Sequence, residues 1–347
     1  MNTKANRRVA IWLLSGCFLI FVMVVVGGIT RLTGSGLSIT EWNVIMGTIP
    51  PTDEAEWQEL FDKYQQIPQY ELVNPHFELH DFKKIFWWEY IHRLIGRLLG
   101  IVFIIPFVWF LVTRQIDKVM IRKSLFLFAL GGLQGFLGWY MVSSGLTERT
   151  SVSHIRLAIH LSAAFITFAF TFWYALDMLD PGRNRSKSKA GLGSLKIIFI
   201  LLFVQIVYGA FVAGMHAGKM YNTFPLMNGH LIPPGMGFLE PWIRNLFDNA
   251  VTVQFIHRGT AIMLFILICR YWWKFRTNQN GKLADFFLAS VVFQFLLGVF
   301  TLLSKAEITL ASLHQIGAFL IFSLNLYLIH TSYLREHSRS EAVTLAN

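Results

Sequence analysis

Eight long apolar segments constrain this chain more than any other feature of its sequence. They are centred on residues 10–29, 88–112, 124–143, 155–177, 194–214, 251–273, 284–303 and 309–333. Each has about 18–25 residues, the length that an α-helix needs to cross the hydrocarbon core of a bilayer. We therefore expect an all-α membrane protein with eight transmembrane helices.

The composition agrees with this expectation. Of the 347 residues, 54% are hydrophobic and 14% are charged, which is too apolar for a soluble domain. The net charge is +10, but the positive residues fall in short connections between the apolar segments. Lysines and arginines placed there orient a membrane protein, so we expect no nucleic-acid partner.

The basic residues also predict a topology. They gather at the N-terminus, in every second connection and in the tail, which all lie on one side if there are eight spans. The positive-inside rule makes that side the cytoplasm, with both termini inside. The basic start MNTKANRR resembles a signal peptide, but no cleavage site follows it, so we expect a retained first helix. The lack of a transit segment rich in arginine and serine favours a bacterial inner (cytoplasmic) membrane.

Two long connections, 30–87 and 215–250, lie on the opposite, outer side. In the first, Trp57, Leu60, Phe61 and Tyr64 follow the spacing of one helical face. This spacing predicts a short amphipathic helix that lies on the outer surface or caps the bundle. The alternative is an ordinary loop helix without a direct part in chemistry.

The two halves of the chain resemble each other. Gly27, Gly36, Gly47 and Pro51 recur 182 residues later as Gly209, Gly218, Gly229 and Pro233, and Ile91-His92-Arg93 recurs 165 residues later as Ile256-His257-Arg258. Gln134 and Gly138 recur 160 residues later as Gln294 and Gly298, and His160 recurs 154 residues later as His314. We expect two pseudo-repeated four-helix bundles in the same orientation, residues 1–178 and 192–335.

Four histidines lie inside apolar segments: His92, His160, His257 and His314. Each belongs to an even-numbered span, which starts on the outside. Each histidine lies 17–22 residues before the next polar residue expected on the cytoplasmic side. At 1.5 Å per residue this is about 25–33 Å of helix, so all four should lie near the outer edge of the hydrocarbon.

Imidazoles on facing helices of a bundle can hold a haem or a metal ion. A lone buried histidine is more often a packing residue, but four at one depth in two repeat-related pairs are harder to explain that way. A zinc or copper site would call for nearby Cys, carboxylate or Met ligands. A haem needs an apolar pocket, two axial imidazoles and cations for its propionates, and Arg93 and Arg258 are candidates for that role. The alternative for both arginines is snorkelling to the membrane surface.

One carboxylate breaks the symmetry of the halves. Glu89 lies three residues before His92 on the same helical face, and the repeat places Gln254 at the corresponding position. An acid in only one half indicates that this half performs chemistry. The alternative is that Glu89 forms a salt bridge with Arg93 at the membrane surface.

Other residues carry weaker signals. His76 and His80 could form a surface metal pair, although a solvated loop is the simpler interpretation, and His216 and His230 lie in the second outer connection. Cys17 and Cys269 both lie in apolar segments, where we expect a packing role rather than a disulfide.

Six stretches together resemble the haem A synthase family, which serves cytochrome oxidase assembly. They are GGITRLTGSGLSITEW (27–42), EYIHRLIGR (89–97), RLAIHLSAAF (156–165), GAFVAGMHAGKMYNTFPLMNG (209–229), FIHRGTA (255–261) and LHQIGA (313–318). The resemblance implies an oxidoreductase that oxidises the C8 methyl of haem O to a formyl group by successive hydroxylation, with oxygen from water and an external electron acceptor.

The resemblance also implies roles for single residues. His92 and His160 would be the axial ligands of the substrate haem in the N-terminal half, and His257 and His314 those of a haem b in the C-terminal half. Glu89 falls on the catalytic glutamate of the family. Arg31, within the first stretch, joins Arg93 and Arg258 as a pocket candidate.

Some members of the family carry a cysteine pair in an outer loop of the N-terminal half. This chain has no cysteine there, so it resembles the branch without that pair. The partners implied are haem O synthase as the supplier of substrate, the cytochrome oxidase assembly machinery and membrane lipid, with a homo-oligomer left open.

Two other functions fit a membrane bundle with buried histidines. A diheme electron-transfer cytochrome should place haems near both faces, whereas all four histidines favour one face. A transporter that relays protons should have polar residues at mid-membrane, where these spans are mostly Leu, Ile, Phe and Val. Both patterns favour the enzyme.

The topology can be tested by labelling. Single-cysteine variants at Ser144 or Thr147, in the third–fourth connection, should react with an impermeant thiol reagent in intact spheroplasts, because this connection is expected outside. Labelling that requires lysis would reverse the topology and undo the depth argument.

Overall fold

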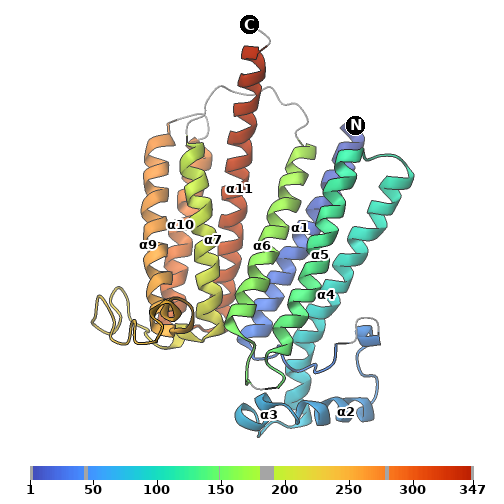
Figure 1. The fold of residues 1–347 in the computed structure, drawn as a ribbon, viewed down its shortest axis with the longest axis vertical. Helices are drawn as coiled ribbons and strands as arrows, with labels where there is room; N and C mark the ends of the chain where they lie inside the picture. Colours follow the sequence, from blue (N-terminus) through green and yellow to red (C-terminus); the bar gives the residue numbers. More distant parts are fainter. Residues whose placement is uncertain (1–2, 43–45, 148, 180–190, 278–280, 345–347) are drawn as a thin grey trace. The chain divides into compact units, whose positions relative to one another are not determined.

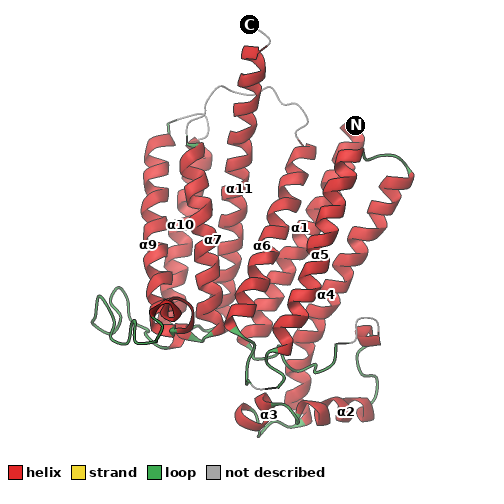
Figure 2. Ribbon diagram, viewed as in Figure 1, coloured by secondary structure: helices red, strands yellow, loops and turns green. Residues whose placement is uncertain are grey.

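The computed structural model describes residues 3–42, 46–147, 149–179, 191–277 and 281–344. Within these ranges the regular structure is helical (Figure 2), apart from an isolated β-bridge between Met227 and His230. Eight of the described helices are long and apolar enough to cross a membrane. They are α1 (Thr3–Leu32), α4 (Leu79–Val112), α5 (Lys118–Ser143), α6 (His154–Leu179), α7 (Leu192–Gly214), α9 (Ala250–Phe275), α10 (Gly281–Leu303) and α11 (Ile308–Thr344). The predicted fold class, an all-α protein with eight transmembrane helices, is confirmed.

The chain divides into two compact units, Ile11–Thr171 and Phe172–Asn347, with Asn2–Ala10 added to the second (Figure 1). These limits fall inside α1 and α6, because the first turns of α1 and the last turns of α6 belong to the second unit. The division into functional halves at 1–178 and 192–335 stays a prediction.

In the first unit, neighbouring helices meet through aromatic side chains. The indole of Trp12 in α1 donates to the main-chain carbonyl of Val102 in α4 at 3.0 Å. Ring contacts join α4 to α5 (Phe103–Phe128) and α5 to α6 (Phe126–Phe170). A Cβ built on Gly16 of α1 would lie 3.8 Å from the Thr171 methyl of α6, so α6 also neighbours α1. The helices therefore follow one another around a ring in the order α1, α4, α5, α6.

The second unit has the same arrangement. Helix α7 packs on α9, α9 on α10, α10 on α11, and α11 returns to α7, and Figure 1 shows these four helices side by side. Leu195, Ile198, Ile268, Phe287 and Leu328 are fully buried between them. The cyclic order matches that of α1, α4, α5 and α6, as expected for tandem copies of one bundle.

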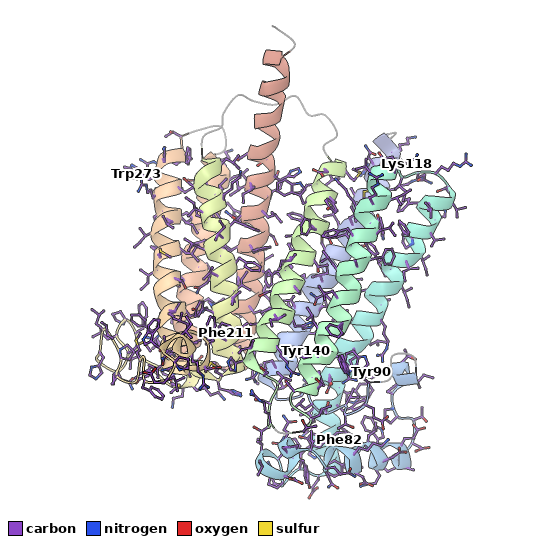
Figure 3. The ribbon with its side chains drawn as sticks, in the orientation of Figure 1. Phe82, Tyr90, Lys118, Tyr140, Phe211 and Trp273 are labelled. Carbon is purple, nitrogen blue, oxygen red and sulfur yellow. The ribbon has the colours of Figure 1, made fainter. Side chains whose placement is uncertain are left out.

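The predicted amphipathic helix is present as α2 (Glu54–Tyr64), and a second short helix, α3 (Pro68–Val73), follows it. Asp53 caps α2 by accepting from the main-chain N–H of Glu56 at 2.9 Å. The face with Trp57, Phe61 and Tyr64 is buried against Phe82 of α4, which Figure 3 labels. Helix α4 begins at Leu79, well before the predicted span at 88, because its added turns pack against α2.

Side-chain caps set where the site-bearing helices of the second unit begin. The side chain of Asn249 accepts from the main-chain N–H groups of Val251 and Thr252, which starts α9. Glu307 accepts from those of Thr309 and Leu310 at 2.9 Å, which starts α11. These two donors hold the pKa of the exposed Glu307 below its usual range, because they favour the carboxylate.

Candidate functional site

The structure brings the four intramembrane histidines together in two pairs. His92 of α4 and His160 of α6 lie close enough to interact electrostatically, and so do His257 of α9 and His314 of α11. All four side chains are partly buried. Each pair comes from two helices of one unit, which is the arrangement that two ligands of one central group require.

Each imidazole packs against a glycine of a neighbouring helix. A Cβ built on Gly27 would lie 3.0 Å from Nε2 of His92, and one on Gly298 would lie 2.8 Å from Cε1 of His314. A Cβ built on Gly138 would lie 3.4 Å from Cε1 of His160, and one on Gly209 would lie 3.3 Å from Cε1 of His257. The repeat in the sequence had identified these glycines only as markers. Their role is to let each imidazole lie directly on the backbone of the next helix.

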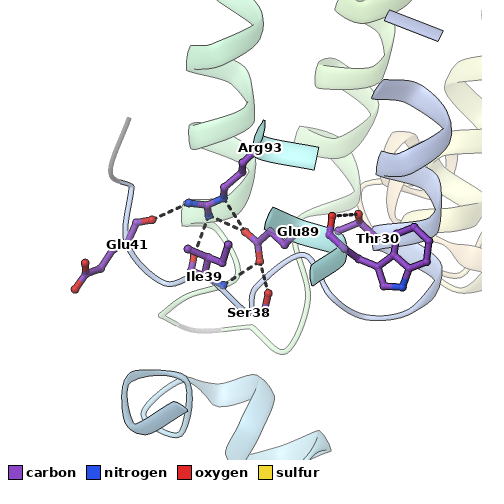
Figure 4. A network of polar contacts seen from close by, with 7 residues as sticks. Thr30, Ser38, Ile39, Glu41, Glu89 and Arg93 are labelled. Carbon is purple, nitrogen blue, oxygen red and sulfur yellow. Dashed lines mark hydrogen bonds and ion pairs between the residues drawn. The ribbon is translucent and has the colours of Figure 1, made fainter. Parts of the chain in front are cut away.

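Glu89 is buried, and both of its carboxylate oxygens are hydrogen-bonded (Figure 4). Oε2 accepts from the hydroxyl of Ser38 at 2.8 Å and from the main-chain N–H of Ile39 at 2.9 Å. Oε1 accepts from Nη2 of Arg93 at 2.7 Å and from its Nε at 3.1 Å. These four hydrogen bonds, two of them from the guanidinium of Arg93, satisfy both oxygens of the carboxylate.

The ion pair with Arg93 exists, but it is not at an exposed surface. The side chain of Glu89 is 4% exposed and that of Arg93 is 13% exposed, so little water screens the pair. Arg93 also donates to the carbonyls of Ile39 at 2.8 Å and Glu41 at 2.7 Å, and its guanidinium lies over the ring of Trp42. The pair therefore fastens the first outer connection to α4.

The second unit repeats this arginine anchor. Arg258 donates to the main-chain carbonyls of Tyr221 at 2.5 Å and Thr223 at 2.9 Å. These carbonyls stand 182 residues after those of Ile39 and Glu41, the offset already seen for the glycines.

The two anchors differ at one residue. In place of a carboxylate, Gln254 donates to the carbonyl of Tyr221 at 3.0 Å. Nε of Arg258 and Oε1 of Gln254 are buried without a hydrogen-bond partner in the described part of the chain. Among these contacts, the carboxylate of Glu89, at the position of the Gln254 amide, is what distinguishes these otherwise repeated anchors.

The remaining candidates lie apart from the imidazole pairs or show no ligand geometry. Arg31 is partly buried at the end of α1. His76, His80 and His230 are exposed, and His80 contacts Asp81. Among the described residues, no group of three or more His, Cys, Asp or Glu could hold a metal ion. Cys17 and Cys269 are both free, as expected.

Sequence analysis missed several polar partners. His330 pairs with Asp177 at 3.0 Å, and Gln205 and Gln294 contact His257 and His314. The glutamines could have been found by their position four residues before Gly209 and Gly298, which places them on the same helical face.

Comparison with known proteins shows the family. The family model COX15-CtaA, described as a cytochrome oxidase assembly protein, matches residues 10–326. A protein named heme A synthase from Nitrosomonas eutropha is 49% identical over 333 residues, covering 94% of each chain. Proteins of the same name from Nitrosospira multiformis and Flavobacterium johnsoniae are 49% and 46% identical, over 94% of this chain and 93% and 98% of theirs.

The two arginine anchors generate a paired prediction. Arg93→Met should lower thermal stability more than Arg258→Met, because only the first leaves a buried carboxylate without its counter-ion. Removing one partner of a buried ion pair costs about 3–5 kcal/mol. The measurement is the thermal unfolding midpoint of both variants in detergent, and equal losses would contradict the assignment of Glu89 as a buried anion.

Proposed function

Because the chain belongs to the COX15-CtaA family of cytochrome oxidase assembly proteins, it has the activity of a haem A synthase, a multi-pass membrane oxidoreductase that converts haem O to haem A, and we propose that its two units divide this task. The first unit holds and oxidises the substrate, and the second holds a resident haem b. The observation that carries this division is the buried, arginine-paired carboxylate of Glu89, three residues before His92 on α4, where the other unit has Gln254.

A resident haem b fits the second unit on three observations. His257 and His314 come from facing helices, Gly209 and Gly298 leave room for both rings, and Nδ1 of His257 is buried without a partner among the described residues. These two histidines would be its axial ligands, and haem b would supply a one-electron redox centre.

The first unit positions the substrate. His92 and His160 would hold the iron of haem O, and this would fix the orientation of the macrocycle and hence of its C8 methyl. Gly27 and Gly138 allow the two imidazoles to lie back against the neighbouring helices. Arg31 is an additional candidate for contact with the propionates, whereas Arg93 and Arg258 already donate to outer carbonyls.

Glu89 supplies the electrostatics of the oxidation. Converting a methyl to a formyl group with oxygen from water releases four electrons and four protons, and positive charge develops on the reacting carbon. A carboxylate held in place by hydrogen bonds from Ser38, Ile39 and Arg93 stabilises that charge. Before Glu89 can also accept a proton, one of these donors must release it.

The proposal extends to the cellular setting. The chain lies in a bacterial inner membrane with both termini in the cytoplasm, as its basic connections predict. It receives haem O from haem O synthase and passes haem A to the cytochrome oxidase assembly machinery.

Glu89→Gln tests the catalytic proposal. The amide keeps the shape and can still accept hydrogen bonds but removes the charge, so this variant should bind both haems and accumulate haem O with little or no haem A. The measurement is chromatographic separation of the haems extracted from the protein produced in cells that make haem O. A wild-type yield of haem A would show that the carboxylate only anchors the outer connection.

The haem b assignment has its own test. His257→Ala or His314→Ala should lose haem b while the protein stays monodisperse in detergent, because one remaining imidazole makes a weak five-coordinate site. His230→Ala, at an exposed histidine of the same unit, serves as the control and should keep its haem b. Full retention of haem b in both buried variants would refute the assignment.

A further inference from the structure

Two glutamines of the second unit hold the residues proposed to bind haem b. Nε2 of Gln294 in α10 donates to the main-chain carbonyl of His314 at 2.8 Å and lies 3.1 Å from Nδ1 of its ring. Nε2 of Gln205 in α7 donates to the carbonyl of His257 at 3.0 Å and lies 3.4 Å from Nε2 of that ring. The bonds to the carbonyls do not depend on the tautomer of either ring. Each histidine is thus tied at its backbone to the helix beside it.

In both units the ring of the first histidine bonds the main chain of the facing helix, His92 to Met23 and His257 to Gln205. The additional side-chain bond at His257 has no counterpart from the equivalent residues of the first unit. The hydroxyl of Thr260 bonds Oε1 of Gln205 and so holds the amide in place. At the repeat offsets, Gln205 corresponds to Met23 and Thr260 to Ile95. Neither of these apolar side chains carries an N–H or O–H group, so the main chain of His92 receives no such bond from them.

The tie at His314 is missing from the first unit for a different reason. Gln134 stands at the position of Gln294, yet its Nε2 is buried without a partner among the described residues, and so is Nδ1 of His160. The glutamine is conserved between the two units, but its contact with the histidine is not.

The two units differ by one methyl group three residues after this histidine. Oε1 of Gln294 lies directly against the backbone of Gly317, where an added Cβ would collide with it. Gly317 lies three residues after His314, and the residue three after His160 is Ala163. By the repeat, the Cβ of Ala163 corresponds to the added Cβ that would collide with the amide of Gln294.

We infer that Gln205, Gln294 and Gly317 are positioning residues that retain a resident haem in the second unit, and that Ala163 keeps His160 untied so that the first unit can release its product. This inference rests on the proposed division between a resident and a substrate haem. A substrate haem must enter and leave in every turnover, so its axial ligand must move off the iron each time. A resident haem gains from ligands whose backbones are held.

The first experiment removes the tie in the second unit. Gln294→Met and Gly317→Ala should each accelerate transfer of haem b from the purified holoprotein to excess apomyoglobin, by about 2- to 10-fold, the factor expected for one net hydrogen bond. The double variant should be no faster than either single variant, because both remove the same contact. Gly193→Ala, where an added Cβ meets nothing within 4 Å, is the control.

The second experiment creates the tie in the first unit. Ala163→Gly should raise the amount of haem A that stays bound through purification, with haem b unchanged, because Gln134 can then reach His160. The same change in a Gln134→Met background should have no effect. Extracted haems are counted per protein, and the thermal midpoint of each variant shows that the fold is retained.

The results distinguish a failure of this inference from a failure of the proposed function on which it rests. The inference would be refuted by wild-type rates of haem b transfer in Gln294→Met and Gly317→Ala. It would also be refuted by an unchanged amount of bound haem A in Ala163→Gly. Neither result would argue against the two haem sites. A purified wild-type protein that contains no haem b would instead overturn the division of the two units.

Discussion

The cost of a polar group inside a membrane bundle organises this structure. In hydrocarbon, a main-chain carbonyl, a guanidinium or a carboxylate must find its partner within the protein. The outer connections of both units supply such partners, because their carbonyls at Ile39, Glu41, Tyr221 and Thr223 accept from Arg93 and Arg258. Each arginine stands one residue after a histidine of the site. Anchoring the outer connection therefore also sets the position of the helix that presents the imidazole.

The two units are one scaffold with a few decisive substitutions. The cyclic order of helices, the four glycine–imidazole contacts and the arginine anchors repeat, so none of them can account for a difference in function. The differences lie at Glu89 against Gln254, Met23 against Gln205, and Ala163 against Gly317. The first difference places a buried carboxylate three residues before His92, and the others concern the hydrogen bonds to the histidine backbones. In the proposed division, these side chains on a common frame separate a resident cofactor from an exchanged substrate.

The sequence predicted what depends on length and periodicity. Eight spans followed from eight apolar segments, and α2 from the spacing of Trp57, Leu60, Phe61 and Tyr64. The sequence could not predict contacts set by loop conformation, such as the bond of Ser38 to Glu89. Arg93 stays a candidate for a propionate from the sequence, and the sequence could not predict that it also donates to the carbonyls of Ile39 and Glu41. Nor could the repeat reveal that Gly317 lies directly against the amide of Gln294, because such a contact depends on the packing of two helices.

Pairing Glu89 with Arg93 limits the distance over which the carboxylate can act. A lone buried anion would be costly to hold, whereas an ion pair with two further donors is stable, but its field is that of a dipole and falls off faster than that of a single charge. Only a cationic centre within a few ångströms of Oε1 or Oε2 would feel it strongly. In the proposed mechanism the reacting carbon must therefore be placed closely, and His92, His160 and the glycines behind them provide that placement. The proposed catalysis in the first unit therefore needs both features together. A carboxylate that is stable enough to stay buried can act on the substrate only if the histidines hold the substrate close to it.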